Sequence, residues 1–169
     1  AIGVIKSLGK EVTIDSKLPA EPTYTQVQET VNWFRASGSD CILAIGGGSV
    51  MDAAKLASIL ATDEYSVKDL LDNPKLAKKQ VKSIMVPTTA GTGAETTPNA
   101  IVAVPEKELK VGIVNDDMIA DAVILDDKMI AHLPRKIAAS TGLDTLCHAI
   151  ECFTSNKANP ISDAFALDA

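Results

Sequence analysis

The chain has 169 residues, 46% of them hydrophobic, so it can bury a sizeable core and does not have the composition of a disordered protein. Its formal net charge of −6 argues against a nucleic-acid-binding or membrane-surface protein, because both need a basic patch, and no apolar run reaches the roughly 20 residues of a membrane-spanning helix. The three cysteines form no C-x-x-C motif, which argues against a disulfide framework or a four-cysteine zinc site and favours a cytoplasmic protein with reduced thiols.

The first third of the chain alternates between predicted helices and strands. In chain order we expect the end of a helix at 1–8, a strand at 11–16, an amphipathic helix at 25–36, a strand at 41–45 and a helix at 50–61. The helix at 25–36 is predicted by Val27, Val31 and Phe34, which recur at helical spacing. The run CILAI at 41–45 is continuously apolar, which is the pattern of a strand buried on both faces.

The rest of the chain changes from mixed structure to helix alone. In chain order we expect a short helix and a loop within 63–80, a strand at 82–87, a hairpin of strands at 99–104 and 109–114, a strand at 121–126, and only helices from about residue 133. Strands that alternate with helices predict a mostly parallel α/β sheet. The change to helix alone predicts a domain boundary, with an α/β domain at 1–134 and the start of a helical domain at 135–169.

Both ends of the chain lead us to expect a longer polypeptide. The sequence has no initiator methionine, and its last residues, ISDAFALDA at 161–169, form an apolar-periodic run without a helix stop signal. We therefore expect the helical domain to be truncated.

A glycine-rich loop, GGGS at 46–49, lies directly between a predicted strand and a predicted helix. In this position a phosphate group can bind the helix N-terminus, and glycines let the backbone approach it closely. The motif is short and is not G-x-G-x-x-G, so a plain tight turn is an equal alternative. Ser49 and Asp52 also fit an ordinary capping box, and Asp52 and Lys55 fit simple helix-end electrostatics.

A second loop, PTTAGTGAE at 87–95, also follows a predicted buried strand. Loops at the carboxyl ends of parallel strands converge on one crevice. Two such loops, both rich in backbone N–H groups and hydroxyls, can hold the two ends of a dinucleotide. Thr88, Thr89 and Thr92 can donate to phosphate or ribose, although for any one of them a hydroxyl satisfied within the loop is the simpler interpretation.

The segment TGLDTLCHAIECF at 141–153 places Asp144 and His148 four residues apart, on one face of a predicted helix. An oxygen and a nitrogen donor at this spacing can bind a metal ion, but two donors are only half of a site. The simpler alternative is that Thr141 caps the helix and Asp144 complements its dipole. The only other histidine, His132, precedes the predicted helix.

Three motifs together resemble the iron-containing alcohol dehydrogenases: AIGGGSVMDAAK at 44–55, VPTTAGTGAE at 86–95 and LPRKIAASTGLDTLCHAIECF at 133–153. Their order and spacing match as well, over nearly the whole chain. The resemblance implies a Rossmann-like dinucleotide-binding domain, whose first strand would precede Ala1, followed by an all-helical metal-binding domain. It also implies an often dimeric or larger enzyme that oxidises a small primary alcohol or diol reversibly to an aldehyde or ketone, with NAD or NADP and with Fe²⁺ or Zn²⁺.

The resemblance extends to individual residues. The implied cofactor contacts are Gly47, Gly48, Ser49, Thr88, Thr89, Thr92 and Lys110. The implied metal ligands are Asp144 and His148, and the family's other two ligands are histidines further along the helical domain, which this sequence does not contain. The chain departs from the family at Ala94, where Ser is usual, and at Glu21, where Asn is common.

Two alternatives remain at this point. Glycerol dehydrogenases and dehydroquinate synthases share a glycine loop and a helical metal domain, although the TTAGTGAE loop and the TGLDTLCHAIE spacing favour the alcohol dehydrogenase branch. The other alternative is a non-catalytic nucleotide-binding fragment, because the sequence supplies only two of the metal donors.

Overall fold

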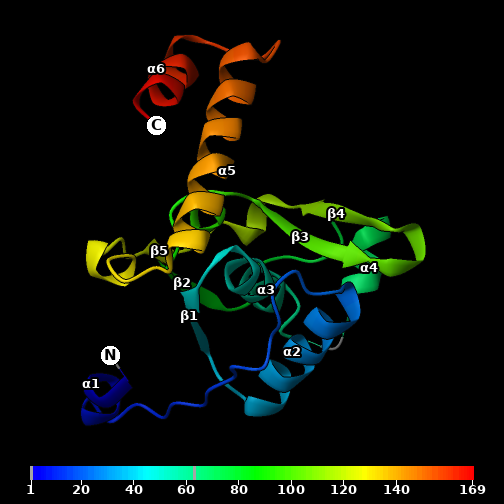
Figure 1. Cartoon of the computed structure of the whole chain (residues 1–169). Helices are drawn as coiled ribbons and strands as arrows, with labels where there is room; N and C mark the ends of the chain where they lie inside the picture. The colour runs from blue at the N-terminus through cyan, green and yellow to red at the C-terminus, as the bar shows by residue number, and fades with distance from the viewer. Residues whose placement is uncertain (1, 63) are drawn as a thin grey trace.

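The computed structural model describes residues 2–62 and 64–169; residues 1 and 63, which begin two of the predicted segments, lie outside them. Figure 1 shows an α/β body from which two C-terminal helices project. The helices are α1 (Ile2–Ser7), α2 (Tyr24–Ser37), α3 (Gly48–Ile59), α4 (Val67–Asp72), α5 (Arg135–Thr154) and α6 (Pro160–Asp168). The strands are β1 (Cys41–Gly46), β2 (Lys82–Pro87), β3 (Asn99–Val104), β4 (Leu109–Val114) and β5 (Ala122–Val123). Short 3-10 turns lie at Ala94–Thr96, Pro105–Lys107, Asp116–Met118 and Asp127–Met129.

The central feature is a parallel sheet with the strand order β1-β2-β5, beside an antiparallel hairpin of β3 and β4. β1 and β2 pair along their whole length, and Gly46 lies opposite Pro87 at their carboxyl ends. The two loops that follow these strands therefore start side by side. The predicted parallel sheet, the hairpin and the helices on either side of β1 are confirmed.

Two strand predictions differ from the structure. Residues 11–16 form no strand, because none of the strands in the described residues lies beside this alternating stretch to share hydrogen bonds with it. The strand predicted at 121–126 is reduced to β5, which pairs with β2 only at Ala122 and Val123. Periodicity predicts which residues can form a strand, but a strand forms only where a neighbouring strand accepts and donates its backbone hydrogen bonds.

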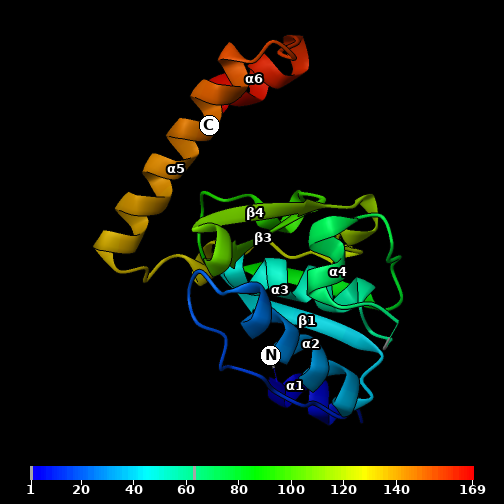
Figure 2. The same ribbon diagram turned by 90° about the vertical axis from the view of Figure 1, so that its right-hand side faces the viewer.

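Helix α3 lies at the centre of the core, between the parallel sheet and the hairpin (Figure 2). Every residue from Met51 to Ile59 is buried. The surrounding core includes Val27 and Val31 of α2, together with Val102 and Ile113 of the hairpin. Because α3 is packed on several sides, the loop that enters it is held in a fixed position.

The prediction that β1 is buried on both faces was wrong. Ala44, on the face that α3 covers, is 5% exposed, whereas Leu43 and Ile45 on the other face are 38% and 40% exposed. Within the described residues, no helix lies over that second face closely enough to bury it. The continuous apolar run shows that both faces of β1 could be buried, but in this structure only the face that carries Ala44 is buried.

Helices α5 and α6 pack against each other and project from the α/β body (Figures 1 and 2). Neither helix contains a buried residue, although α5 carries large apolar side chains such as Leu143 and Leu146. The prediction that only helices follow residue 133 is confirmed, because α5 and α6 are the only regular elements among the described residues of that segment. Among residues 2–62 and 64–169, no helix is both long enough and apolar enough to cross a bilayer.

Candidate functional site

The glycine loop and the threonine loop lie against each other at the carboxyl ends of β1 and β2. The backbone N–H of Thr88 donates to the carbonyl of Gly46 over 2.8 Å. A Cβ on Gly48 would come within 3.1 Å of the Thr92 side chain, and one on Gly47 within 3.4 Å of Thr89. The structure thus brings together six of the seven predicted cofactor residues, and the close contact at Gly48 leaves little room for a side chain.

The first turn of α3 is free of side-chain caps. Gly47 is the N-cap residue, and no side-chain hydrogen bond satisfies the helix start. The alternative of a capping box at Ser49 and Asp52 is wrong, because Ser49 lies inside the helix and its hydroxyl accepts from the backbone N–H of Glu21 over 3.3 Å. Uncapped N–H groups at the start of a twelve-residue helix are suited to an anion.

Lys55 is a residue whose role in the core was missed by sequence reasoning, which assigned it to a helix end. It is fully buried, and its ammonium donates to the carbonyl of Ala94 over 2.8 Å and to that of Asn99. It also pairs with Asp52 at 2.8 Å, and the other Asp52 oxygen accepts from the backbone N–H of Ile101 over 2.9 Å. Helix α3, the threonine loop and strand β3 are therefore joined through one charged pair.

Burial lowers the pKa of Lys55 from its ordinary value, and the carboxylate of Asp52 opposes this shift. The expectation of simple helix-end electrostatics was wrong, because both side chains point into the protein rather than along an exposed helix end. The sequence signal for this role is the pair of charges Asp52 and Lys55 in the stretch VMDAAKLASIL, which is otherwise apolar except for Ser58. Charges within a buried helix need partners.

Lys110, the seventh predicted cofactor residue, reaches the same region from the hairpin. Its ammonium forms an ion pair with Glu21 at 2.6 Å, and both side chains are more than half exposed. Glu21 in turn contacts Ser49 through its backbone N–H. The structure therefore connects Lys110 to the start of α3 through Glu21, whose carboxylate is already bound to the lysine.

Asp144 and His148 lie on one face of α5, as predicted, with 3.8 Å between Asp144 Oδ1 and His148 Nε2. The Thr141 cap is wrong, because α5 begins at Arg135, and the Thr141 hydroxyl instead donates to the carbonyl of Ile137 over 3.0 Å. Within the described parts of the chain, no group of three or more His, Cys, Asp or Glu residues is arranged to hold a metal ion. The pair has the donor types of a metal site but only two of the donors.

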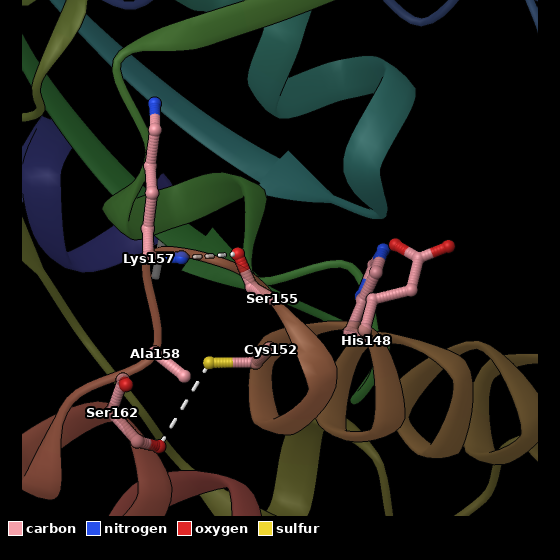
Figure 3. Close-up of a pocket in the computed structure, with 7 residues that line it drawn as sticks. His148, Cys152, Ser155, Lys157, Ala158 and Ser162 are labelled. Carbon is pink, nitrogen blue, oxygen red and sulfur yellow. Dashed lines mark hydrogen bonds between the residues drawn. The ribbon is translucent and has the colours of Figure 1, made fainter.

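An open hollow of about 330 Å³ lies next to this pair, between the end of α5 and the loop that leads to α6 (Figure 3). His148, Cys152 and Ser162 are among the residues that line it. The Cys152 thiol donates to the carbonyl of Ser162 over 3.8 Å, which joins the two helices. Asp144 is not among the lining residues, so the Asp144–His148 pair and the hollow share only His148.

The threonine loop touches α5 at one close contact. A Cβ on Gly91 would lie 2.4 Å from the backbone oxygen of Thr141. Thr141 precedes Asp144 by three residues, which is nearly one helical turn. The loop of the predicted cofactor site and the helix of the predicted metal site are therefore in direct contact.

Comparison with known proteins gives two family matches. The family model described as "Iron-containing alcohol dehydrogenase" matches residues 2–127. The model described as "Fe-containing alcohol dehydrogenase family, C-terminal" matches residues 138–169. Among curated relatives, the chain is 33% identical to an NAD-dependent methanol dehydrogenase of Bacillus methanolicus, over 98% of this chain and 43% of that protein. It is 38% identical to a sulfoacetaldehyde reductase of Bilophila wadsworthia, over 99% of this chain and 45% of that protein.

Solved structures agree with these matches. An iron-containing alcohol dehydrogenase of Thermotoga maritima superposes with a TM-score of 0.88 at 33% identity, over 99% of this chain and 46% of that one. A sulfoacetaldehyde reductase of Bifidobacterium kashiwanohense, solved in complex with NAD⁺, superposes with a TM-score of 0.86 at 31% identity, over 98% of this chain and 46% of that one. The chain spans less than half the length of these relatives. With the fold, the motifs and the family matches in agreement, the chain belongs to the iron-containing alcohol dehydrogenase family.

Proposed function

We propose that this chain forms the dinucleotide-binding part, and the first half of the metal site, of an NAD(P)-dependent alcohol oxidoreductase. The observation that carries the proposal is the contact between the two loops, in which Gly47 and Gly48 lie against Thr89 and Thr92. Ligands of open parallel sheets bind in the crevice at the carboxyl ends of the strands, which is where these loops meet. The proposed division of the chain is an α/β domain at 1–134 and the start of a helical domain at 135–169.

Each part of a dinucleotide has a matching feature in this region. The uncapped start of α3, with Gly47, Gly48 and Ser49, is suited to the pyrophosphate because N–H groups and the helix dipole favour negative charge. The hydroxyls of Thr88, Thr89 and Thr92 are suited to phosphate or ribose oxygens. Lys110 adds a positive charge from the hairpin, and the presence of NAD⁺ in the similar sulfoacetaldehyde reductase supports this assignment.

Asp144 and His148 are the proposed metal ligands of this chain. Their donor types accept Fe²⁺ or Zn²⁺, and such an ion supplies Lewis acidity to the oxygen of an alcohol substrate. The contact between Gly91 and Thr141 supports a shared site, because it holds the helix that carries the ligands next to the cofactor loop. The remaining donors would have to come from outside the described residues.

The proposed substrate class is a small primary alcohol or diol and its aldehyde. Relatives named as methanol dehydrogenase, choline dehydrogenase and 4-hydroxybutyrate dehydrogenase differ in substrate, and each matches this chain over less than half of its own length. Nucleotide binding without turnover is the alternative function, favoured because no group of three or more metal donors comes together within the described residues.

Titration with NADH and NADPH, followed by cofactor fluorescence, tests the proposal directly. We expect saturable binding of at least one of them, and competition by ADP, which carries the pyrophosphate. Oxidation of a panel of alcohols and diols with NAD⁺ and NADP⁺, after anaerobic loading with Fe²⁺ or Zn²⁺, then separates an enzyme from a binding fragment. Absence of any dinucleotide binding by folded protein would overturn the proposal.

A further inference from the structure

Glu21 occupies a position in which it limits the positive charge of the proposed cofactor site. Its carboxylate lies 2.6 Å from the ammonium of Lys110, the lysine proposed to serve the dinucleotide. Its backbone N–H donates to the hydroxyl of Ser49, in the first turn of α3. One residue thus contacts both the helix start and the cation from the hairpin.

The backbone fixes Glu21 in this place. The next residue, Pro22, accepts a hydrogen bond of 3.0 Å from the N–H of Ala103, and Ala103 pairs with Lys110 across the hairpin. Glu21 itself has a φ of 51°, in the left-handed region that residues other than Gly, Asn and Asp seldom adopt. The segment is therefore anchored to the strand opposite Lys110, which directs the carboxylate toward the ammonium.

This arrangement has an electrostatic consequence for an incoming pyrophosphate. A lysine that already holds a carboxylate offers less positive charge to a second anion, and the carboxylate itself repels that anion. The Glu21 and Lys110 side chains are 70% and 51% exposed, so water and salt weaken their attraction and the lysine can exchange partners.

We propose that Glu21 sets an upper limit on the dinucleotide affinity of this chain by holding Lys110 until the cofactor replaces it. The proposal rests on the proposed function, since it needs a pyrophosphate-bearing ligand at the start of α3. It assigns to Glu21 a role in tuning affinity, and it predicts that removing this acid improves binding.

The test is an NADH titration of four variants beside the unchanged chain. Glu21→Gln removes the charge but keeps the length of the side chain. Glu108→Gln is the matched control, because Glu108 is also a glutamate with a left-handed φ, of 52°, and lies in the turn of the hairpin that carries Lys110. Lys110→Met and the double variant Glu21→Gln/Lys110→Met complete a double-mutant cycle.

At low salt we expect Glu21→Gln to bind NADH about two- to fivefold more tightly, the range of an exposed ion pair. The gain should shrink in 0.5 M salt, because screening weakens the pair that the substitution removes. The gain in NADH affinity should disappear in the Lys110→Met background. Glu108→Gln should bind NADH with the affinity of the unchanged chain.

Unchanged or weaker binding by Glu21→Gln, with binding by the unchanged chain intact, would overturn the inference and leave the proposed function standing. A gain that persists without Lys110, or that Glu108→Gln reproduces, would also overturn it, because the effect would then be one of general charge. If no variant binds NADH at any salt concentration, the proposed function itself fails and the inference fails with it.

Discussion

Gly91 lies so close to Thr141 that a Cβ on the glycine would sit 2.4 Å from the threonine's backbone oxygen. This contact joins the threonine loop to α5, and the atom in the way belongs to a helix backbone and cannot rotate aside as the end of a side chain can. The spacing between the two proposed halves of the site therefore depends on the absence of a side chain at position 91.

Gly91→Ala should separate the loop from α5. We expect faster amide hydrogen exchange in the loop at 88–93 and in the first turns of α5, because the contact that protects both is lost. Gly142→Ala is the matched control, since nothing lies within 4 Å of a Cβ at that position and alanine favours a helix. Equal exchange in Gly91→Ala and the unchanged chain would mean that the contact does not hold the two parts together.

Thr92→Val should weaken NADH binding about tenfold, the effect expected when a hydrogen bond to a charged group is lost. The substitution keeps the shape of the side chain that lies 3.1 Å from a Cβ built on Gly48, so the packing of the two loops is retained. The measurement is a fluorescence titration with NADH. Thr13→Val, at an exposed position near the N-terminus, is the control, and equal affinities would remove Thr92 from the site.

Metal binding by this chain should be weak and should depend on Asp144 and His148. Asp144→Asn and His148→Ala are each expected to abolish the heat of Zn²⁺ binding in calorimetry, because either substitution leaves a single strong donor. His132→Ala removes the only other histidine and should change nothing. If His132→Ala also abolished the heat of binding, the assignment to the α5 pair would be wrong.

Lys55→Met should destabilise the chain by about 3 to 5 kcal/mol, because it leaves the buried carboxylate of Asp52 without its partner. Adding Asp52→Asn should recover part of this loss, since the amide oxygen can still accept from Ile101 and no buried charge remains. Urea unfolding measures both free energies. Lys10→Met, at an exposed position, is the control, and a double variant no more stable than Lys55→Met would argue against a coupled pair.

Asp121 should make the stability of the chain sensitive to acid. Hydrogen bonds from Lys79 and from the backbone N–H of Ser83 hold the pKa of Asp121 below its ordinary value. The ionised carboxylate thus stabilises the folded state above about pH 4, and this contribution is lost as the pH falls through the lowered pKa. Asp121→Asn should melt at a lower temperature than the unchanged chain at pH 6, and the difference should narrow at pH 3.

Asp40→Asn removes another exposed carboxylate and is the comparison for that experiment. A difference between Asp121→Asn and the unchanged chain that stays constant from pH 6 to pH 3 would mean that the ionisation of Asp121 does not contribute to folding.

The parts of the site that follow apolar strands could be predicted from the sequence. The runs CILAI and KSIMVP have the length and composition of strands, and parallel strands bring the loops that follow them together. Local pattern failed where the outcome depended on distant partners. Thr141 has the sequence context of a helix cap, but α5 has already begun six residues earlier, and residues 11–16 alternate like a strand without a neighbour to pair with.

Lys55 and Glu21 illustrate the same limit for charges. A lysine three residues after an aspartate looks like an exposed helix pair, and only the fold reveals that carbonyl groups from 94 and 99 surround its ammonium. Glu21 is separated from Lys110 by 89 positions, so nothing local in the sequence indicates that they meet.

The network around Lys55 also restricts how this protein can change. A substitution there alters three structural elements at once, since its ammonium is shared by α3, the threonine loop and strand β3. A variant library that randomises Lys55 alone should return almost only lysine among folded clones. Libraries that vary Asp52 together with Lys55 should yield folded clones with uncharged residues at both positions. This part of the core can therefore be redesigned only by changing both residues at the same time.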